Sequence, residues 1–324
     1  MAKVCLSRSG TAPITIQVQC ISLSGKSVDH DVSDTLYRLL AAHCARWRTV
    51  ALIAAPALPV MILKQLIGNL LLLETVMLKV THYSQARLLG VIRSAPKLRN
   101  FIIAGIREVH VTSLPWYQLT RLSGFAIGVY DCLALLQQTP NISLLDVHFQ
   151  PVPTTSIRII PHIHLAFLNR LNITCNGGEL LGSFFDHLTF PSLDQLSFGG
   201  ILDDATPTFA SMLARSSTLK PVLNISLALP GAHPPWHVVQ IMEVTPNVEN
   251  LTVAHNETIQ HLTAVDEVLN LFIVSDGRRL LPKMQTFAYR SQWPPGIGNG
   301  VTLVDMIKSR RRVGSGDGIS QLLS

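Results

Sequence analysis

The sequence has few charged residues. Only 14% of its 324 residues are Asp, Glu, Lys or Arg, against about 25% in an ordinary soluble domain, whereas 48% are hydrophobic. Intrinsic disorder needs the opposite balance, so this composition excludes a chain that is mostly disordered. The 20 Gly and 19 Pro follow no triplet period, which excludes a collagen-like fold. The formal net charge of +6 is small for this length and identifies no partner.

Cysteine is also scarce and scattered. The five cysteines form no C-x-x-C pair, which excludes a zinc ribbon and a dithiol redox motif. The first residues, MAKVCLSRSGTAPITIQV, lack the apolar core and small-residue cleavage site of a signal peptide. We therefore interpret the cysteines as reduced and mostly buried, and expect a cytoplasmic or nuclear protein.

One apolar stretch, Val50–Leu73, is long enough to cross a bilayer. Pro56 and Pro59 interrupt its first half, and Glu74 follows it directly. Because proline breaks a helix, the stretch favours a strand, a loop, a helix and a second strand over a membrane span. Attachment to a membrane through this stretch stays as a weaker alternative.

Internal repetition is the clearest signal in the sequence. Segments of the form L-x-x-L-x-L, with apolar substitutions, return at steps of 21 to 29 residues and finally of 36 residues. Leucine-rich repeats have periods of 20–29 residues. The segments begin at Trp47, Leu73, Leu98, Leu119, Ile142, Leu168, Leu193, Leu219, Val248 and Met284, and the register at Leu119 and Leu219 is the least regular.

The residues between these segments have the apolar spacing of helices, and proline stands two residues before five of the segments. One short strand and one helix per repeat predict an α/β fold: a leucine-rich-repeat-like solenoid with a curved parallel sheet inside and helices outside. We expect residues 1–45 to form an N-terminal strand–helix cap, residues 46–312 the degenerate repeats, and residues 313–324 a flexible tail.

The polar positions of the repeat strands are the candidate binding residues. Side chains alternate along a strand, so these positions face the concave side of the sheet. The set is mixed and slightly basic, which suits a protein partner better than a phosphate groove. The residues selected are Arg99, Arg121, Asp146, Arg170, Asn172, Asp194, Glu249 and Arg290.

The motifs typical of catalysis and of metal binding are missing or incomplete. Gly25-Lys26-Ser27 resembles the end of a phosphate-binding loop, but Cys20 stands where that loop needs its first glycine. His162 and His164 have no further ligand type within several residues. We expect no enzyme, cofactor or metal, with a nucleotide-binding protein or enzyme using Gly25-Lys26-Ser27 as the alternative function.

The basic run 308–312 could act as a nuclear signal or contact nucleic acid, or it could stabilise the negative end of the last helix. The second interpretation is favoured. We expect neither nucleic acid nor membrane as a partner.

Several short motifs, in their order along the chain, resemble the fungal F-box proteins with degenerate leucine-rich repeats. They run from about Leu6 to Arg312, beginning with LSRSG and the Pro13-Ile14 pair. The others are Arg46–Val50, SLPWYQLTRL from Ser113, Cys132–Asn141, Leu188–Leu193, Leu213–Ser217, Leu280–Pro282 and Met306–Arg310.

The resemblance implies the substrate-recognition part of an SCF-type ubiquitin ligase receptor, which binds a protein substrate on the concave repeat face. In that family an F-box precedes the LSRSG-like segment and docks by a helix in a groove. No L-P-x-E-[IL]-L-x-x-I-F helix occurs in these 324 residues. The chain therefore fits either a shortened protein or a repeat-only relative, and a Skp-type adaptor and a cullin are expected as partners only if an F-box lies upstream.

Overall fold

The computed structural model of the chain describes residues 2–19, 30–53, 60–79, 86–104, 114–150, 160–175, 181–200, 205–216, 222–229, 235–255, 269–273, 280–291 and 300–313. The chain divides into two compact units. Unit 1 consists of Met1–Ile127 and Ala134–His148, and unit 2 of Gly128–Leu133 and Phe149–Ser324.

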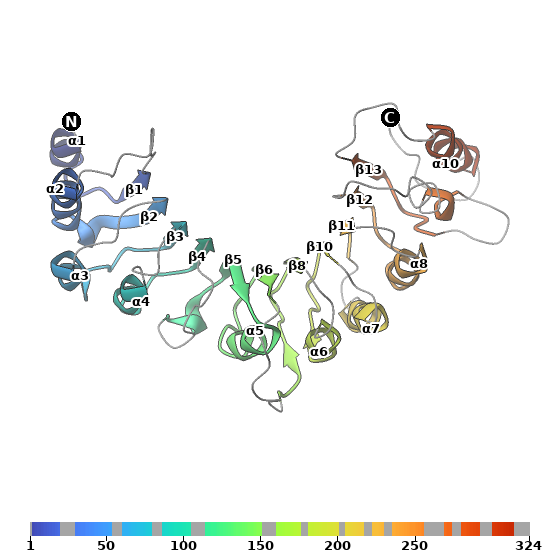
Figure 1. Cartoon of the computed structure of the whole chain (residues 1–324), viewed down its shortest axis with the longest axis horizontal. Coiled ribbons are helices and arrows are strands. Elements are labelled where there is room, and N and C mark those ends of the chain that lie inside the picture. Colours follow the sequence, from blue (N-terminus) through green and yellow to red (C-terminus); the bar gives the residue numbers. More distant parts are fainter. Residues whose placement is uncertain are drawn as a thin grey trace. The chain divides into compact units, whose positions relative to one another are not determined.

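Unit 1 has six parallel strands that follow one another in chain order. Helices cover one face of this sheet and leave the other open (Figure 1). The elements are α1 (Ala2–Arg8), β1 (Ile14–Gln19), α2 (His30–Ala41), η1 (Cys44–Arg46), β2 (Trp47–Ile53), α3 (Val60–Leu66), β3 (Thr75–Lys79), α4 (Ala86–Ile92), β4 (Asn100–Ala104), η4 (Trp116–Gln118), β5 (Arg121–Ile127) and β6 (Leu144–Phe149). Helix α5 (Val129–Leu136) contributes residues to both units.

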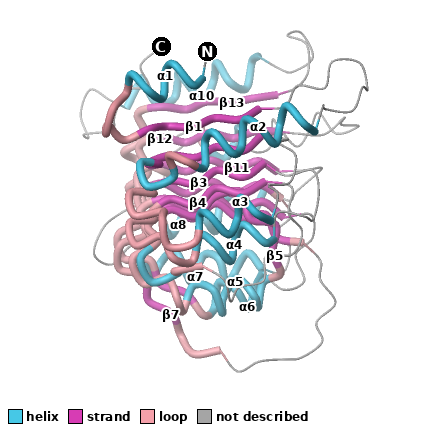
Figure 2. Tube along the Cα trace, turned by 90° about the vertical axis from the view of Figure 1, so that its left-hand side faces the viewer, coloured by secondary structure: helices cyan, strands magenta, loops and turns pink. Residues whose placement is uncertain are grey.

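Unit 2 repeats the pattern with five parallel strands in chain order, and Figure 2 shows strands running side by side. Two short strands, β7 and β9, pair with each other in a separate parallel sheet. The elements are β7 (Ile163–His164), β8 (Arg170–Cys175), α6 (Leu181–Asp186), β9 (Leu188–Thr189), β10 (Gln195–Gly199), α7 (Thr206–Ser216), β11 (Asn224–Leu229), α8 (Pro235–Val244), β12 (Asn250–His255), β13 (Thr286–Ser291) and α10 (Gly300–Val313).

The apolar positions of the repeat form the core. In the second repeat Leu73, Val76 and Leu78 are each at most 1% exposed, because they face the helices. Burying such side chains contributes roughly 1.5–3 kcal/mol each. Eleven strands alternating with helices therefore confirm the expected leucine-rich-repeat-like α/β fold. Strand β2 starts at Trp47, the first apolar position of its segment, whereas β3 and β4 start two residues after theirs.

The register predicted at Leu219 was wrong. Residues 217–221 lie outside the described part of the chain, and strand β11 begins at Asn224. The motif is therefore Val222-Leu223-Asn224-Ile225-Ser226-Leu227, with Val222, Ile225 and Leu227 buried. The frame at Leu219 matches only the first two apolar positions, Leu219 and Val222, and has Asn224 at the third, whereas the frame at Val222 matches all three.

Backbone hydrogen bonds join successive repeats at the start of each strand. The carbonyl of Glu74 accepts the N–H groups of Arg99 and Asn100 at 2.9 and 3.0 Å. In unit 2 the carbonyl of Glu249 accepts those of Gln285 and Thr286 at 2.7 and 2.9 Å. This pairing fixes the register, so side chains at equivalent positions of neighbouring strands lie next to one another.

Strand β5 contains a glycine that no other residue can replace without strain. Gly124 has φ +78°, and a Cβ atom there would overlap the carbonyl of Ile103. The irregularity explains the buried pattern of this strand, in which Leu122 and Phe125 are three residues apart rather than two.

The apolar stretch from Val50 to Leu73 forms the end of β2, then α3, as the proline positions predicted; residues 54–59 lie outside the described part. Among the described residues, no helix combines the length and the apolar character needed to cross a membrane.

The N-terminal region contains the expected strand and helix, in the form of β1 and α2, and in addition the short helix α1. The basic run at the end of the chain is partly internal, because Arg310 of α10 is 1% exposed and donates to backbone carbonyls. Neither interpretation of the run from sequence anticipated this contact.

Candidate partner-binding face

The candidate site is the face of each sheet that the helices leave uncovered, called here the open face. Strand residues alternate between this face and the core. In β3, Val76 and Leu78 are buried, whereas Thr75, Met77 and Lys79 are partly or fully exposed. A helix is about 10 Å wide and neighbouring strands are about 4.8 Å apart, so helices on one side make the open face concave.

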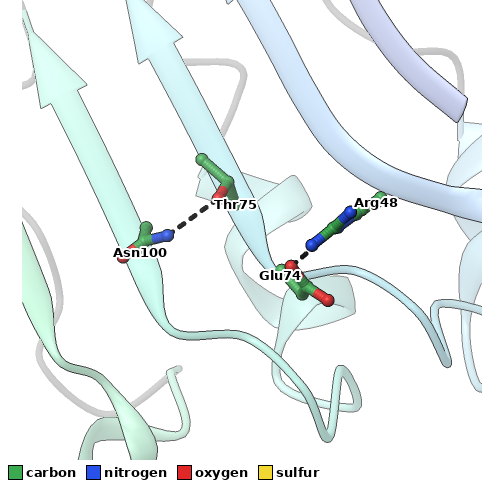
Figure 3. A network of polar contacts seen from close by, with 4 residues as sticks. All are labelled: Arg48, Glu74, Thr75 and Asn100. Atoms are coloured by element: carbon green, nitrogen blue, oxygen red, sulfur yellow. Dashed lines mark hydrogen bonds and ion pairs between the residues drawn. The ribbon is translucent and has the colours of Figure 1, made fainter.

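The first row of side chains on the open face of unit 1 is polar. The register aligns Thr49, Thr75, Asn100 and Arg121 across β2 to β5. The amide Nδ2 of Asn100 donates to Thr75 Oγ1 at 2.9 Å (Figure 3). Two residues after Arg121 on β5, in the second row beside Ile102, Ser123 Oγ donates to the carboxylate of Asp146. These bonds hold the polar side chains in place before any partner arrives.

The second row on the same face is apolar. Ala51, Met77 and Ile102 are paired in register on β2, β3 and β4. Ala51 is buried, and Met77 and Ile102 are half-buried although they point away from the core. This apolar strip lies next to the polar first row, and an apolar centre beside polar groups is the composition of a protein interface. Periodicity alone could have identified Met77 and Ile102, because they occupy the same x-positions as the polar candidates.

Charged side chains at the edge of this face form intramolecular contacts with neighbouring repeats. Arg48 Nε and Glu74 Oε2 form an exposed ion pair at 2.8 Å between neighbouring repeats (Figure 3). The guanidinium of Arg99, a predicted contact residue, donates to the carbonyl of Gln118 at 3.2 Å. Arg99 therefore supports the turn before β5, and Arg121 is the exposed cation of this row.

The open face of unit 2 is built from amides and hydroxyls. Arg170, Gln195, Asn224 and Asn250 are aligned in its first row, and Asn172, Ser197, Ser226 and Thr252 in its second. Asn250 Nδ2 donates to Asn224 Oδ1 at 2.8 Å. The wrong register at Leu219 had hidden Asn224 and Ser226, the only described members of β11 that continue these rows with half-exposed side chains.

The remaining predicted contact residues differ in position. Asp194 and Glu249 directly precede β10 and β12 and are half-buried, and their carbonyls receive the N–H groups of the following repeat. Arg290 belongs to β13, paired with Ala254, and its side chain is outside the described part. The structure thus places four of the predicted residues on the open faces: Arg121, Asp146, Arg170 and Asn172. Asp194 and Glu249 lie just before their strands.

The described residues offer little for catalysis or metal binding. They contain no group of three His, Cys, Asp or Glu side chains arranged to hold a metal. His162 Nε2 lies 2.8 Å from Thr189 Oγ1 next to the β7–β9 pair. Burial raises the pKa of the Cys132 and Cys44 thiols, which keeps them protonated. Gly25-Lys26-Ser27 lies outside the described residues.

The cavity in the apolar core of unit 1 is small. Ile16, Trp47, Leu66 and their apolar neighbours enclose about 20 Å³, about the space of one water molecule. This cavity therefore offers no ligand site.

No protein-family model matches the chain, and the comparison with curated proteins found no match. The repeat architecture defines the class of the protein: an α/β repeat protein with a leucine-rich-repeat-like fold.

Proposed function

We propose that the chain is a non-catalytic protein-binding module whose partner lies across the open face. The observation that carries this proposal is the half-buried apolar pair Met77 and Ile102 on the open face, next to a polar, hydrogen-bonded first row. Apolar side chains on the uncovered side of a sheet contribute nothing to the core. They gain burial only when a partner covers them.

The exposed arginines of the first rows would set the orientation of the partner. Arg121 and Arg170 are exposed and lie on the first rows of their units. Charged groups at the rim of an interface contribute mainly to association rate and specificity. Reversing both charges with Arg121→Glu and Arg170→Glu is expected to weaken partner binding without unfolding the chain. Unchanged affinity with intact circular dichroism would refute this assignment.

The finer proposal is that the module is the substrate-recognition part of an F-box protein, acting in the cytoplasm or nucleus. It rests on the ordered motifs from LSRSG to Met306–Arg310 and on the repeat fold. Affinity purification of this chain beside a fusion that carries a generic F-box at Met1 tests it. The proposal expects adaptor and cullin only with the fusion, and the same further proteins with both. Different partner sets for the two baits would contradict it.

A further inference from the structure

A groove beside β1 forms a second possible site in unit 1, outside the open face. Its volume is about 610 Å³, within the range of about 300–1,000 Å³ typical of ligand sites. Its walls are Cys5 and Leu6 of α1, Ser9 and Pro13 of the following turn, the whole of β1, and Leu36 and Leu40 of α2. In the described sheet, β1 is the first strand and pairs only with β2, so its other edge borders this groove.

The free edge of β1 offers backbone hydrogen-bonding groups. In β4 the N–H of Asn100, an open-face residue, bonds to the carbonyl of Glu74 just before the preceding strand. Through the continuous register of β4, β3, β2 and β1, the equivalent residues of β1 are Thr15, Gln17 and Gln19. Their N–H and C=O groups therefore point toward the side where the described sheet has no further strand.

From Thr15 to Gln19 this edge has neither a charged residue nor a proline, and the register shift of β1 is confined to its start, between Ile14 and Thr15. Proteins protect exposed edges with lysine, proline, bulges or a covering helix, because an unpaired edge accepts another chain. Among the described residues, the groove between α1 and β1 borders that edge.

The wall of the groove is held by specific contacts. Arg46 of η1 donates from Nη2 to Ser9 Oγ at 2.6 Å and from Nε to the carbonyl of Ala12 at 2.9 Å. Ser9 Oγ in turn donates to the carbonyl of Leu6 at 2.9 Å. The turn that follows α1 is thus fixed against the first repeat, which lowers the entropy cost of binding at the groove.

We propose that this groove binds an extended, uncharged segment of a partner protein, which adds a strand to the free edge of β1. Main-chain bonds to Thr15, Gln17 and Gln19 would supply affinity over about 20 Å of strand. Alternate side chains of the segment pack against Leu6, Leu36 and Leu40. A charged side chain there would lose its hydration without gaining a counter-ion, because the lining residues are neutral at pH 7.

The probe is a random 12-residue peptide library displayed on phage and selected against the full chain. Selected peptides are synthesised, and their affinities are measured by fluorescence anisotropy. We expect peptides with apolar residues at alternate positions and few charges. Gln17→Pro removes one edge N–H and obstructs the approach of a strand, so it should weaken binding at least tenfold. The matched control Gln17→Ala keeps the backbone and should change affinity less than twofold.

A second variant keeps the test decisive if Gln17→Pro disturbs the fold. Leu36→Lys places a charge in the wall, leaves β1 intact, and should also weaken binding at least tenfold. Peptides that are rich in charge, or that bind both variants as tightly as the natural chain, would overturn the proposal. So would a stable dimer that Gln17→Pro disrupts, because the occupant would then be a second copy of β1. Arg121 does not line the groove, so Arg121→Glu should weaken binding at the open face and leave the affinity for the groove peptides unchanged.

Discussion

The buried arginine of α10 gives the sharpest prediction about stability. Arg310 is 1% exposed, and its guanidinium donates to three backbone carbonyls: Phe272 at 3.2 Å, Leu281 at 3.0 Å and Leu280 at 2.7 Å. Leu281 has φ +51°, a left-handed conformation that a leucine rarely adopts. The arginine thus ties α10 to a strained turn 29 or more residues earlier in the sequence.

The size of the effect follows from these bonds. Desolvation lowers the pKa of Arg310 to about 10, so the side chain is still charged at neutral pH. Replacing it by methionine keeps most of the volume and removes the guanidinium donor from the carbonyls of Phe272 and Leu280, whereas the Leu281 carbonyl still accepts the N–H of Met284 at 3.1 Å. Each unsatisfied group costs at least about 1 kcal/mol, so Arg310→Met should lower the free energy of unfolding by about 2 kcal/mol or more. Arg310→Lys keeps a charge but not the planar arrangement of donors, so its free energy of unfolding should lie between those of the natural chain and Arg310→Met.

Urea denaturation followed by circular dichroism measures the change, and hydrogen exchange of residues 300–313 locates it. The matched control is Lys308→Ala on the same helix, because Lys308 is exposed and its removal should cost less than about 0.5 kcal/mol. A loss below about 1 kcal/mol for Arg310→Met, or equal losses for both variants, would refute the reasoning.

Three further predictions concern single positions. Gly124→Ala should destabilise the chain by about 2–4 kcal/mol in thermal unfolding, since φ +78° and the overlap with a neighbouring carbonyl both penalise a Cβ atom; a smaller loss than about 1 kcal/mol would contradict this. In a Cys20→Ser background, a disulfide reagent should label Cys5 rapidly and Cys132 only after unfolding, because Cys5 is exposed and burial raises the pKa of Cys132. Rapid labelling that persists when Cys5→Ser is added would contradict this prediction. Equilibrium dialysis with labelled ATP and GTP should detect no saturable binding at millimolar ligand, and saturation abolished by a change at Gly25-Lys26-Ser27 would restore the nucleotide-binding alternative.

The repeat fold could be predicted because it depends on local periodicity. Each strand needs three apolar residues at fixed spacing, and each spacing is visible in the sequence. The frame failed at Leu219, where Leu219 and Val222 fit the first two apolar positions but Asn224 occupies the third. The frame at Val222 has all three apolar positions, and β11 follows it.

The candidate site was predictable only in part. Alternation places Arg121 and Asn172 on the open faces, but it does not show that Arg99 is engaged by the Gln118 carbonyl. Such bonds join residues from different repeats, and their geometry depends on how the turns fold. The carbonyls that Arg310 contacts could not be predicted from the sequence for the same reason.

The central claim is that the open face binds a protein. Affinity purification with identification of bound proteins by mass spectrometry tests it with three baits: the natural chain, Ile102→Lys and Met61→Lys. Ile102 lies on the open face, whereas Met61 lies on α3 and is 73% exposed. The account predicts proteins that are retained by the natural chain and by Met61→Lys but lost from Ile102→Lys, with unchanged circular dichroism in all three. Equal recovery on Ile102→Lys, or loss on Met61→Lys alone, would contradict it.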